Sequence, residues 1–215
     1  PFGGVRALQL WARHFTMSIF DKSSISIVED KTLWKGWSHL RRVTFDFFRE
    51  GRKPHRLEWE VFDRSEAAGI LLHNVETDTV TLVRQFRIPA HLMGDHPFLL
   101  EVPAGFIDDG ETAEEAAIRE AFEETGYRIN RVRKAFAPYM SPGSVTEKLH
   151  GFYATVVDAD RVADGGGLDE EKEDLEVVEL PFDAALAMID RGEIVDAKTI
   201  MLLLWAALQS KTGSN

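Results

Sequence analysis

The chain has 215 residues, of which 44% are hydrophobic and 28% are charged, and its formal net charge at pH 7 is -11. This composition is typical of a globular protein with one domain of ordinary size and a small accessory element. The negative charge repels long polyanions and argues against binding to DNA or RNA. The chain has no cysteine, which excludes disulfides, thiolate nucleophiles and cysteine-based zinc sites and fits the reducing cytoplasm in which we expect the protein.

We expect three parts along the chain. Residues 1–23 read as an extension or tag-like leader, to which we assign no function. Residues 24–62 contain three segments of alternating hydrophobicity, SISIVED, HLRRVTFDFFR and HRLEWEVFDR, which predict a small antiparallel sheet that serves as a dimerisation element. Residues 63–210 are expected to form the main domain of the chain.

The main part alternates strands with a few helices. In chain order we predict strands at 68–74, 79–88 and 98–107, a helix at 113–125, strands at 131–139 and 149–157, a glycine- and acid-rich loop at 163–174, a strand at 176–180, and helices at 182–191 and 198–209. The fold class is therefore α/β or α+β, with helices on a mixed sheet. The longest apolar run, residues 200–208, is shorter than the roughly 20 residues that a membrane span needs, so we expect no membrane association.

The helix predicted at 113–125 has clear signals at both ends. Thr112 followed by Glu115 is a capping box, which starts a helix. Gly126 can end it in a left-handed conformation. We expect four residues to form the face that packs on the sheet: Ile118, Ala121, Phe122 and Thr125.

A second face of this helix is acidic. Glu120, Glu123 and Glu124 are spaced i, i+3, i+4 and so share one side, and we expect Ala116 and Ala117 to leave room beside them. Taken alone, this pattern more often marks a solvated helix face. Like charges at this spacing cost about a few tenths of a kcal/mol per pair, and a divalent cation such as Mg²⁺, which prefers carboxylate oxygens, would relieve the repulsion.

The residues around the helix decide between these interpretations, because seven positions match the pattern G-x5-E-x7-R-E-U-x-E-E-x-G-U, in which U is apolar. They are Gly105, Glu111, Arg119, Glu120, Glu123, Glu124 and Gly126. At a background frequency of about 6% per position, a chance match is on the order of one in 10⁸ to 10⁹. The chain thus resembles the Nudix hydrolase family. The resemblance implies an α/β/α sandwich and the hydrolysis of a nucleoside diphosphate linked to another moiety, with Mg²⁺ or Mn²⁺ as cofactor.

The resemblance extends beyond this box. MSPGSVTEKLH, ADGGGLDEEKEDLEVVELPF and GEIVDAKTIMLLL, with VFDRSEAAGILL and LVRQFRIPA upstream, are similar to segments of the bacterial GDP-mannose hydrolases of this family. The similarity covers about residues 25–208 and departs in the acidic loop after Gly167, which is slightly longer here. It implies that the substrate is a nucleoside-diphosphate sugar, with GDP-mannose cleaved to GMP and mannose 1-phosphate.

The resemblance also implies roles for single residues. The metal ligands would be the backbone carbonyl of Ala104 and the carboxylates of Glu120 and Glu124. Glu123 would be a further catalytic carboxylate, acting directly or through water. Glu173 would be another metal ligand or would lie near the general base.

Other roles concern the substrate and the architecture of the site. Nine residues are expected to contact the substrate: Trp37, Glu58, Trp59, Glu60, Arg87, Gly105, Phe106, Glu147 and Lys198. Glu147 is also the alternative to Glu173 as general base. Glu111 and Arg119 would form a structural ion pair. Trp37 and the segment 58–60 would reach the nucleotide from the partner subunit of a homodimer that exchanges strands.

Two other functions stay open. An ADP-ribose pyrophosphatase, which yields AMP and ribose 5-phosphate, would use the same chemistry with a different base pocket. Pro142 fits that subgroup, although it also fits an ordinary S-P-G turn. A non-catalytic sensor of the same fold would bind a nucleotide sugar without cleaving it, but such a protein is expected to lose box carboxylates, and all of them are present here.

Overall fold

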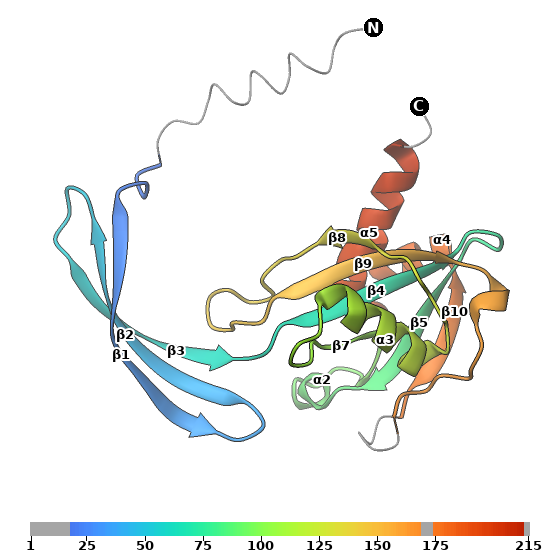
Figure 1. The fold of residues 1–215 in the computed structure, drawn as a ribbon, viewed down its shortest axis with the longest axis horizontal. Helices are drawn as coiled ribbons and strands as arrows, with labels where there is room; N and C mark the ends of the chain where they lie inside the picture. The colour runs from blue at the N-terminus through green and yellow to red at the C-terminus, as the bar shows by residue number, and fades with distance from the viewer. Residues whose placement is uncertain (1–17, 169–173, 213–215) are drawn as a thin grey trace, which may run out of the picture. The chain divides into compact units, whose positions relative to one another are not determined.

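Two units make up the chain. The computed structural model describes residues 18–168 and 174–212 (Figure 1). One unit runs up to Arg64 and includes the short segment Gly143–Val145, and the other contains the rest. We describe each unit by itself.

The N-terminal unit is a three-stranded antiparallel sheet. Its strands are β1 (Ser23–Lys35), β2 (His39–Arg49) and β3 (His55–Asp63), in the order β1-β2-β3. Cross-strand ion pairs stabilise the pairing; one joins Arg56 to Asp46 at 2.8 Å. The three alternating segments of the sequence therefore form the predicted small sheet.

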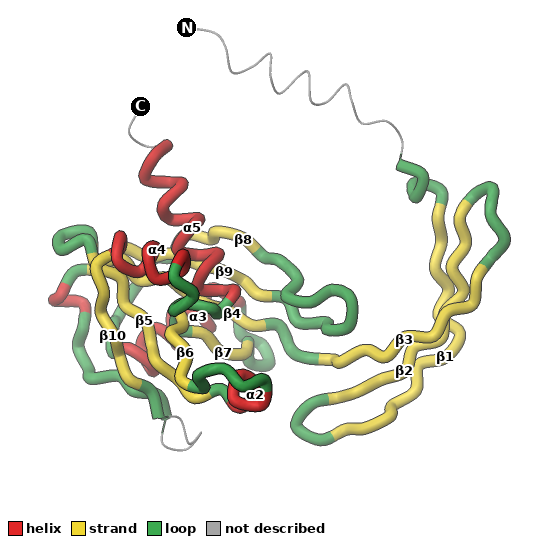
Figure 2. The backbone as a smooth tube through the Cα atoms, turned by 180° about the vertical axis from the view of Figure 1, so that it is seen from behind, coloured by secondary structure: helices red, strands yellow, loops and turns green. Residues whose placement is uncertain are grey.

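The second unit is built on a seven-stranded mixed sheet. Its strands are β4 (Ala67–Asn74), β5 (Thr79–Phe86), β6 (Phe98–Glu101), β7 (Ala104–Phe106), β8 (Arg133–Phe136), β9 (Leu149–Val156) and β10 (Glu176–Pro181). The order is β10-β5-β4-β9-β8, with β6 paired to β5 and β7 paired to β4 (Figure 2). β4 and β9 run parallel and the other pairs are antiparallel. A mixed sheet of this kind is what the alternation of strands and helices predicted.

Helices cover both faces of this sheet. They are α2 (Ile88–Leu92), α3 (Ala113–Thr125), the short 3-10 helix η1 (Asp158–Asp160), α4 (Phe182–Asp190) and α5 (Ala197–Thr212). α3 lies on one face, and α4 and α5 lie on the other (Figure 1). None of the described helices is long and apolar enough to cross a membrane.

Strand β4 shows how the sequence produces these layers. Its side chains alternate between the two faces. Ile70 and Leu72 belong to the core cluster under α3, whereas Leu71 belongs to the cluster under α4 and α5. All three are fully buried, so the strand is apolar from Ala67 to Leu72, as expected for a central strand covered on both sides. The predicted helix–sheet–helix sandwich is confirmed.

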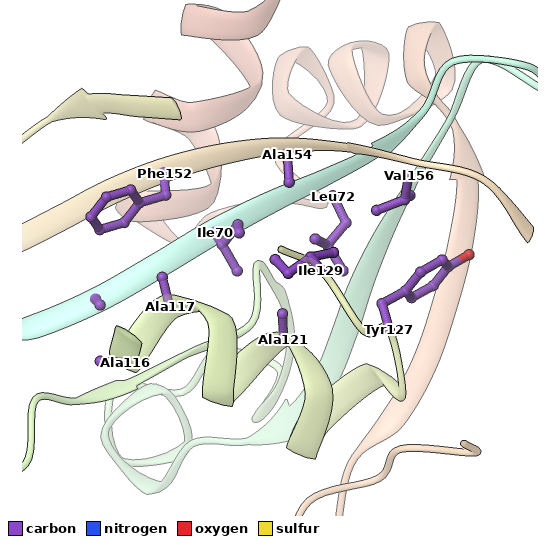
Figure 3. Close-up of a cluster of buried hydrophobic side chains, with 11 residues drawn as sticks. Ile70, Leu72, Ala116, Ala117, Ala121, Tyr127, Ile129, Phe152, Ala154 and Val156 are labelled. Carbon is purple, nitrogen blue, oxygen red and sulfur yellow. The ribbon is translucent and has the colours of Figure 1, made fainter. Parts of the chain in front are cut away.

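The orientation of α3 differs from the prediction. Ala116 and Ala117, which we expected beside the acidic face, are fully buried against the sheet (Figure 3). Phe122, which we expected in the core, is 39% exposed. The buried face is thus turned by roughly a quarter of the helix circumference from the predicted one. As a result Glu120 and Glu124 lie within the buried arc of the helix.

Proline residues explain two differences in the strand boundaries. The strand predicted at 98–107 is divided into β6 and β7, with Pro103 between them. The strand predicted at 79–88 ends at Phe86 because Pro89 lies in the first turn of α2. Proline has no N–H to offer to a strand ladder and is well suited to the start of a helix.

Candidate active site

The start and end of α3 are fixed by its own sequence. The N-cap residue Thr112 accepts a hydrogen bond from the backbone N–H of Glu115 at 3.2 Å, and its own N–H donates to the Glu115 carboxylate at 2.8 Å. Gly126 ends the helix at φ +78, a left-handed conformation. Both predicted signals are confirmed, and together they set where the helix begins and ends.

Two carboxylates of α3 are buried against the start of β7. Glu120 is 8% exposed and Glu124 is 2% exposed. The backbone N–H of Ala104 donates to Oε2 of Glu124 at 3.3 Å. A Cβ atom added to Gly105 would lie 1.8 Å from Oε1 of Glu120, so any other residue here would require the Glu120 carboxylate to move away from the backbone. The carboxylates of Glu120 and Glu124 therefore lie next to the backbone of residues 104–105.

Arg119 holds the acidic face together. Its guanidinium donates to both carboxylate oxygens of Glu111, at 2.9 and 3.0 Å. It also donates to Glu120 at 2.8 Å, to Glu123 at 3.0 Å and to the carbonyl of Phe106 at 3.0 Å. The hydrogen bonds with Glu111 raise the pKa of Arg119 above its ordinary value, burial opposes this, and Glu120 adds to the increase. The expected ion pair with Glu111 is present, and it is part of a larger network.

The glycine-rich loop closes the other end of α3. The N–H of Gly166 donates to the carbonyl of Glu124 at 2.8 Å, and the N–H of Gly167 donates to the carbonyl of Glu123 at 3.2 Å. A Cβ added to Gly165 would lie 2.5 Å from the carbonyl oxygen of Glu124. The loop thus satisfies carbonyls that a helix end otherwise leaves to water. Sequence reasoning missed this contact, although three consecutive glycines at 165–167 signal a close backbone approach.

Arg87 and Lys198, two predicted substrate contacts, meet at one buried acid. Arg87 donates from Nε and Nη2 to the two carboxylate oxygens of Glu101, at 2.7 and 2.8 Å. Lys198 contacts the same carboxylate and lies 3.1 Å from Asp196. Glu101 ends β6 and was not singled out from the sequence. The one available signal was an acid at the end of the apolar run FLLE.

Comparison with known proteins shows the family. Residues 63–203 match the NUDIX domain family. The chain belongs to the Nudix family. Its Nudix relatives include the GDP-mannose pyrophosphatase of Klebsiella pneumoniae subsp. pneumoniae, 46% identical over 194 residues, which cover 89% of this chain and 96% of the relative. The GDP-mannose pyrophosphatase of Citrobacter koseri is 47% identical over 181 residues, covering 83% and 93%.

The Nudix fold is also seen in a solved structure. A crystal structure of an ADP compounds hydrolase superposes with a TM-score of 0.69, covering 89% of this chain and 96% of that one, at 21% identity. At this identity the likeness concerns the fold. The chain is thus a Nudix hydrolase by family and by architecture, and Nudix hydrolases generally use divalent metal ions.

The Nudix box residues present here fit such an ion. Glu120 and Glu124 supply hard oxygen donors in a buried position, which suits Mg²⁺, and Gly105 leaves the space that a Cβ would fill. An ion bound by Glu120 would compete with Arg119 for the same carboxylate oxygen. Within residues 18–168 and 174–212, no set of three or more histidine, aspartate or glutamate side chains is arranged to hold a metal. Glu173, the expected additional ligand, lies outside the described residues.

The other predicted site residues fall in two groups. In the second unit, the carbonyl of Phe106 is bound by Arg119 of α3. Glu147 lies between β8 and β9 and is half-buried, with its backbone carbonyl accepting from the N–H of Met140 at 3.1 Å. The remaining four belong to the N-terminal unit: Trp37, Glu58, Trp59 and Glu60. Trp37 is 83% exposed and stacks with the guanidinium of Arg64, 5.1 Å from the ring centroid.

Proposed function

We propose that this Nudix hydrolase cleaves the pyrophosphate of a nucleoside-diphosphate sugar with Mg²⁺, converting GDP-mannose to GMP and mannose 1-phosphate. The observation that carries the proposal is the 46% identity, across 89% of the chain, to a relative named GDP-mannose pyrophosphatase. Because the match covers 96% of that relative, it includes segments outside the box, which must determine the choice of sugar and base.

Glu120, Glu124 and the carbonyl of Ala104 would hold the metal, with Glu173 as an additional ligand. A bound Mg²⁺ would neutralise the diphosphate and lower the pKa of an attacking water molecule. The oxygen of that water forms a new bond to one phosphorus atom, and the bond from this phosphorus to the bridging oxygen breaks. The bridging oxygen leaves with the other phosphate, and the proton of the water passes to a carboxylate. Glu147 and Glu173 are the two candidates for this general base.

The protein would bind the rest of the substrate from several elements. Arg87 and Lys198 would contact the phosphates, since guanidinium and ammonium groups are the usual partners of phosphate oxygens. Gly105 and Phe106 would approach the phosphates through their backbone. Glu147 would contact the sugar if it is not the base.

The N-terminal unit would complete the site in a homodimer with exchanged strands. Large apolar side chains of its strands are more than half exposed in the single chain: Ile25, Ile27, Trp34 and Trp59. An exposed sheet with such side chains favours association with a second copy. Trp37 and Glu58, Trp59 and Glu60 would then reach the nucleotide from the partner subunit.

A comparison of substrates tests the proposal. We would measure kcat/KM for GDP-mannose, GDP-glucose, ADP-ribose and ADP-glucose at one Mg²⁺ concentration and identify the products. A site that hydrogen-bonds guanine is expected to reject adenine by about 10²- to 10⁴-fold, because buried polar groups would lose their partners. A preference for ADP-ribose would contradict the proposal in favour of an ADP-ribose pyrophosphatase. Absence of hydrolysis with every substrate would favour a nucleotide-sugar sensor.

A further inference from the structure

Glu101 joins two cationic residues that are far apart in the sequence. Arg87 precedes it by 14 residues and Lys198 follows it by 97. Its side chain is 3% exposed, whereas that of Arg87 is 40% exposed. The carboxylate therefore lies on the inner side of the group, and the guanidinium lies toward solvent.

The ion pairs are strong enough to keep this acid charged. Burial raises the pKa of Glu101, but the hydrogen bonds and charges of Arg87 and Lys198 outweigh burial and hold the pKa below its usual value. A carboxylate that stays ionised in a buried position is a fixed point on which two cations can be oriented.

The first turn of α5 holds Lys198 at this point. The Asp196 carboxylate accepts hydrogen bonds from the N–H of Thr199 at 3.0 Å and from its hydroxyl at 2.6 Å. The Thr199 hydroxyl in turn accepts from the N–H of Val102 at 2.8 Å. Since Val102 directly follows Glu101, the start of α5 and the end of β6 are fixed to each other.

Both cations keep donors for a ligand. Arg87 uses its Nε–Nη2 edge for Glu101, so the Nη1 group of the planar fork is directed away from that carboxylate. Within the described residues, the contacts of Lys198 with Glu101 and Asp196 account for two of its three N–H donors. Burial lowers the pKa of Arg87, but the charges of Glu101, Asp196 and, least of all, Glu124 outweigh it and hold the pKa above its ordinary value. Of the carboxylates proposed to hold the metal, Glu124 therefore acts electrostatically on Arg87.

We infer that Glu101 is a positioning residue, which holds Arg87 and Lys198 side by side as a ready-made binding site for the diphosphate of the substrate. The inference rests on the proposed function for the identity of the ligand. Without Glu101, two neighbouring cations would repel each other and regain rotamer freedom, and binding would have to restore their order. The alternative role is opposite in sign: if Glu101 only competes with the diphosphate for the two cations, its removal would strengthen binding.

The experiment is a mutant cycle on ligand binding. The dissociation constant of GDP with Mg²⁺ would be measured by titration calorimetry for the wild type, Glu101→Gln, the double variant Arg87→Met/Lys198→Met, and the triple variant. We expect Glu101→Gln to weaken GDP binding by about 10-fold or more and to raise KM for GDP-mannose more than it lowers kcat. In the background that lacks Arg87 and Lys198, it should have no further effect.

A matched control removes an ion pair of the same type from the neighbouring strands. Glu176 on β10 pairs with Arg84 on β5 at 3.1 Å and is exposed, so Glu176→Gln should leave GDP binding unchanged. If Glu101→Gln does not fold, Glu101→Asp replaces it, because this change keeps the charge and only withdraws it from the cations. Its effect should be smaller and should likewise disappear in the double background.

The outcomes separate this inference from the proposed function. Tighter or unchanged GDP binding by the Glu101 variant overturns the inference, as does equal weakening in the double background, which would indicate a general structural role. A wild type that does not bind GDP overturns it as well. The wild type could bind GDP without hydrolysing any nucleotide sugar. If Glu101→Gln then loses GDP binding, the inference is supported and the proposed function is contradicted. If the protein hydrolyses GDP-mannose and the effects of the variants on GDP binding are additive, the proposed function is supported and the inference is contradicted.

Discussion

The backbone N–H of Ala104 donates to the carboxylate of Glu124 at 3.3 Å, which ties the last turn of α3 to the start of β7. This contact joins a side chain of the Nudix box to a backbone group just before the box, 20 residues away in the sequence. It also predicts how the helix responds when the charge of Glu124 is removed.

Glu124→Gln should keep the fold and lose activity. The amide oxygen of glutamine can still accept from Ala104, but the variant lacks the charge that a metal ligand supplies. We expect turnover with Mg²⁺ to fall by at least about 10²-fold, because part of the electrostatic stabilisation of the transition state is lost. Glu114→Gln, an exposed change in the first turn of the same helix, is the control and should remain active. A folded Glu124→Gln protein with near wild-type turnover would rule out the metal assignment.

Removing Glu111 should make stability depend less on pH. Hydrogen bonds from Arg119 lower the pKa of Glu111, outweighing burial, which raises it. A lowered folded-state pKa means that the ion pair stabilises the protein above the pKa of glutamate in the unfolded chain, about 4.3. This stability is lost as pH falls through the lower, folded-state value.

Urea denaturation of the wild type and Glu111→Gln at several pH values checks the direction of this pH dependence. At pH 7 we expect the variant to be less stable by about 1–2 kcal/mol, since the pair is partly exposed to solvent. The difference should shrink below about pH 4. Glu76→Gln, in the exposed turn after β4, should change stability little at either pH. A difference that grows in acid would contradict the role of Arg119.

Gly126→Ala should destabilise the protein. The residue has φ +78, and an added Cβ would lie 1.9 Å from the carbonyl oxygen of Ala163. The left-handed conformation alone costs about 1 kcal/mol for alanine, and the clash adds to this because the atoms that the Cβ would meet belong to the backbone of Ala163. We expect a lower Tm in thermal denaturation. Gly143→Ala, where nothing lies within 4 Å of the added Cβ, should leave Tm nearly unchanged; equal Tm shifts would show that the close approach is unimportant.

The exposed side chains of the N-terminal sheet predict a dimer. Light scattering at micromolar concentration should give twice the chain mass of 24.3 kDa. Ile27→Glu, at a position 59% exposed in the single chain, should shift the protein toward monomer and reduce activity, because a charge in an apolar interface is costly. Val75→Glu, similarly exposed at 55% in the turn after β4, should do neither. An active wild-type monomer would refute the composite site.

The sequence predicted the features of this protein that depend on neighbouring residues. The capping box of Thr112 and Glu115 and the left-handed Gly126 are local, so their spacing was sufficient to find them. The inward turn of Glu120 and Glu124 was missed because hydropathy assigns carboxylates to the solvent side of a helix. In α3 the two acids are buried together with the neighbouring alanines, and they face the backbone of β7.

Features that depend on distant contacts were not predictable in the same way. Arg87 and Lys198 were singled out, but the residue that joins them was not, because nothing in the sequence around Glu101 indicates a partner 97 residues away. The contact of Gly166 with the end of α3 is likewise a meeting of two backbones. Contacts between backbone atoms leave no pattern of side chains in the sequence from which they could be predicted.

Because the glycine loop is bound to the end of α3, the position of this helix does not depend on the number of residues that follow the loop. Gly166 binds the carbonyl of Glu124 on one side and accepts from the N–H of Leu175 at 3.2 Å on the other. The segment between these two residues therefore starts and ends at a single anchored point. The entropy of closing such a segment rises only with the logarithm of its length, so one or two inserted residues cost a fraction of about 1 kcal/mol. A change in the number of residues between Gly166 and Leu175 is therefore compatible with an unchanged position of α3 on the sheet.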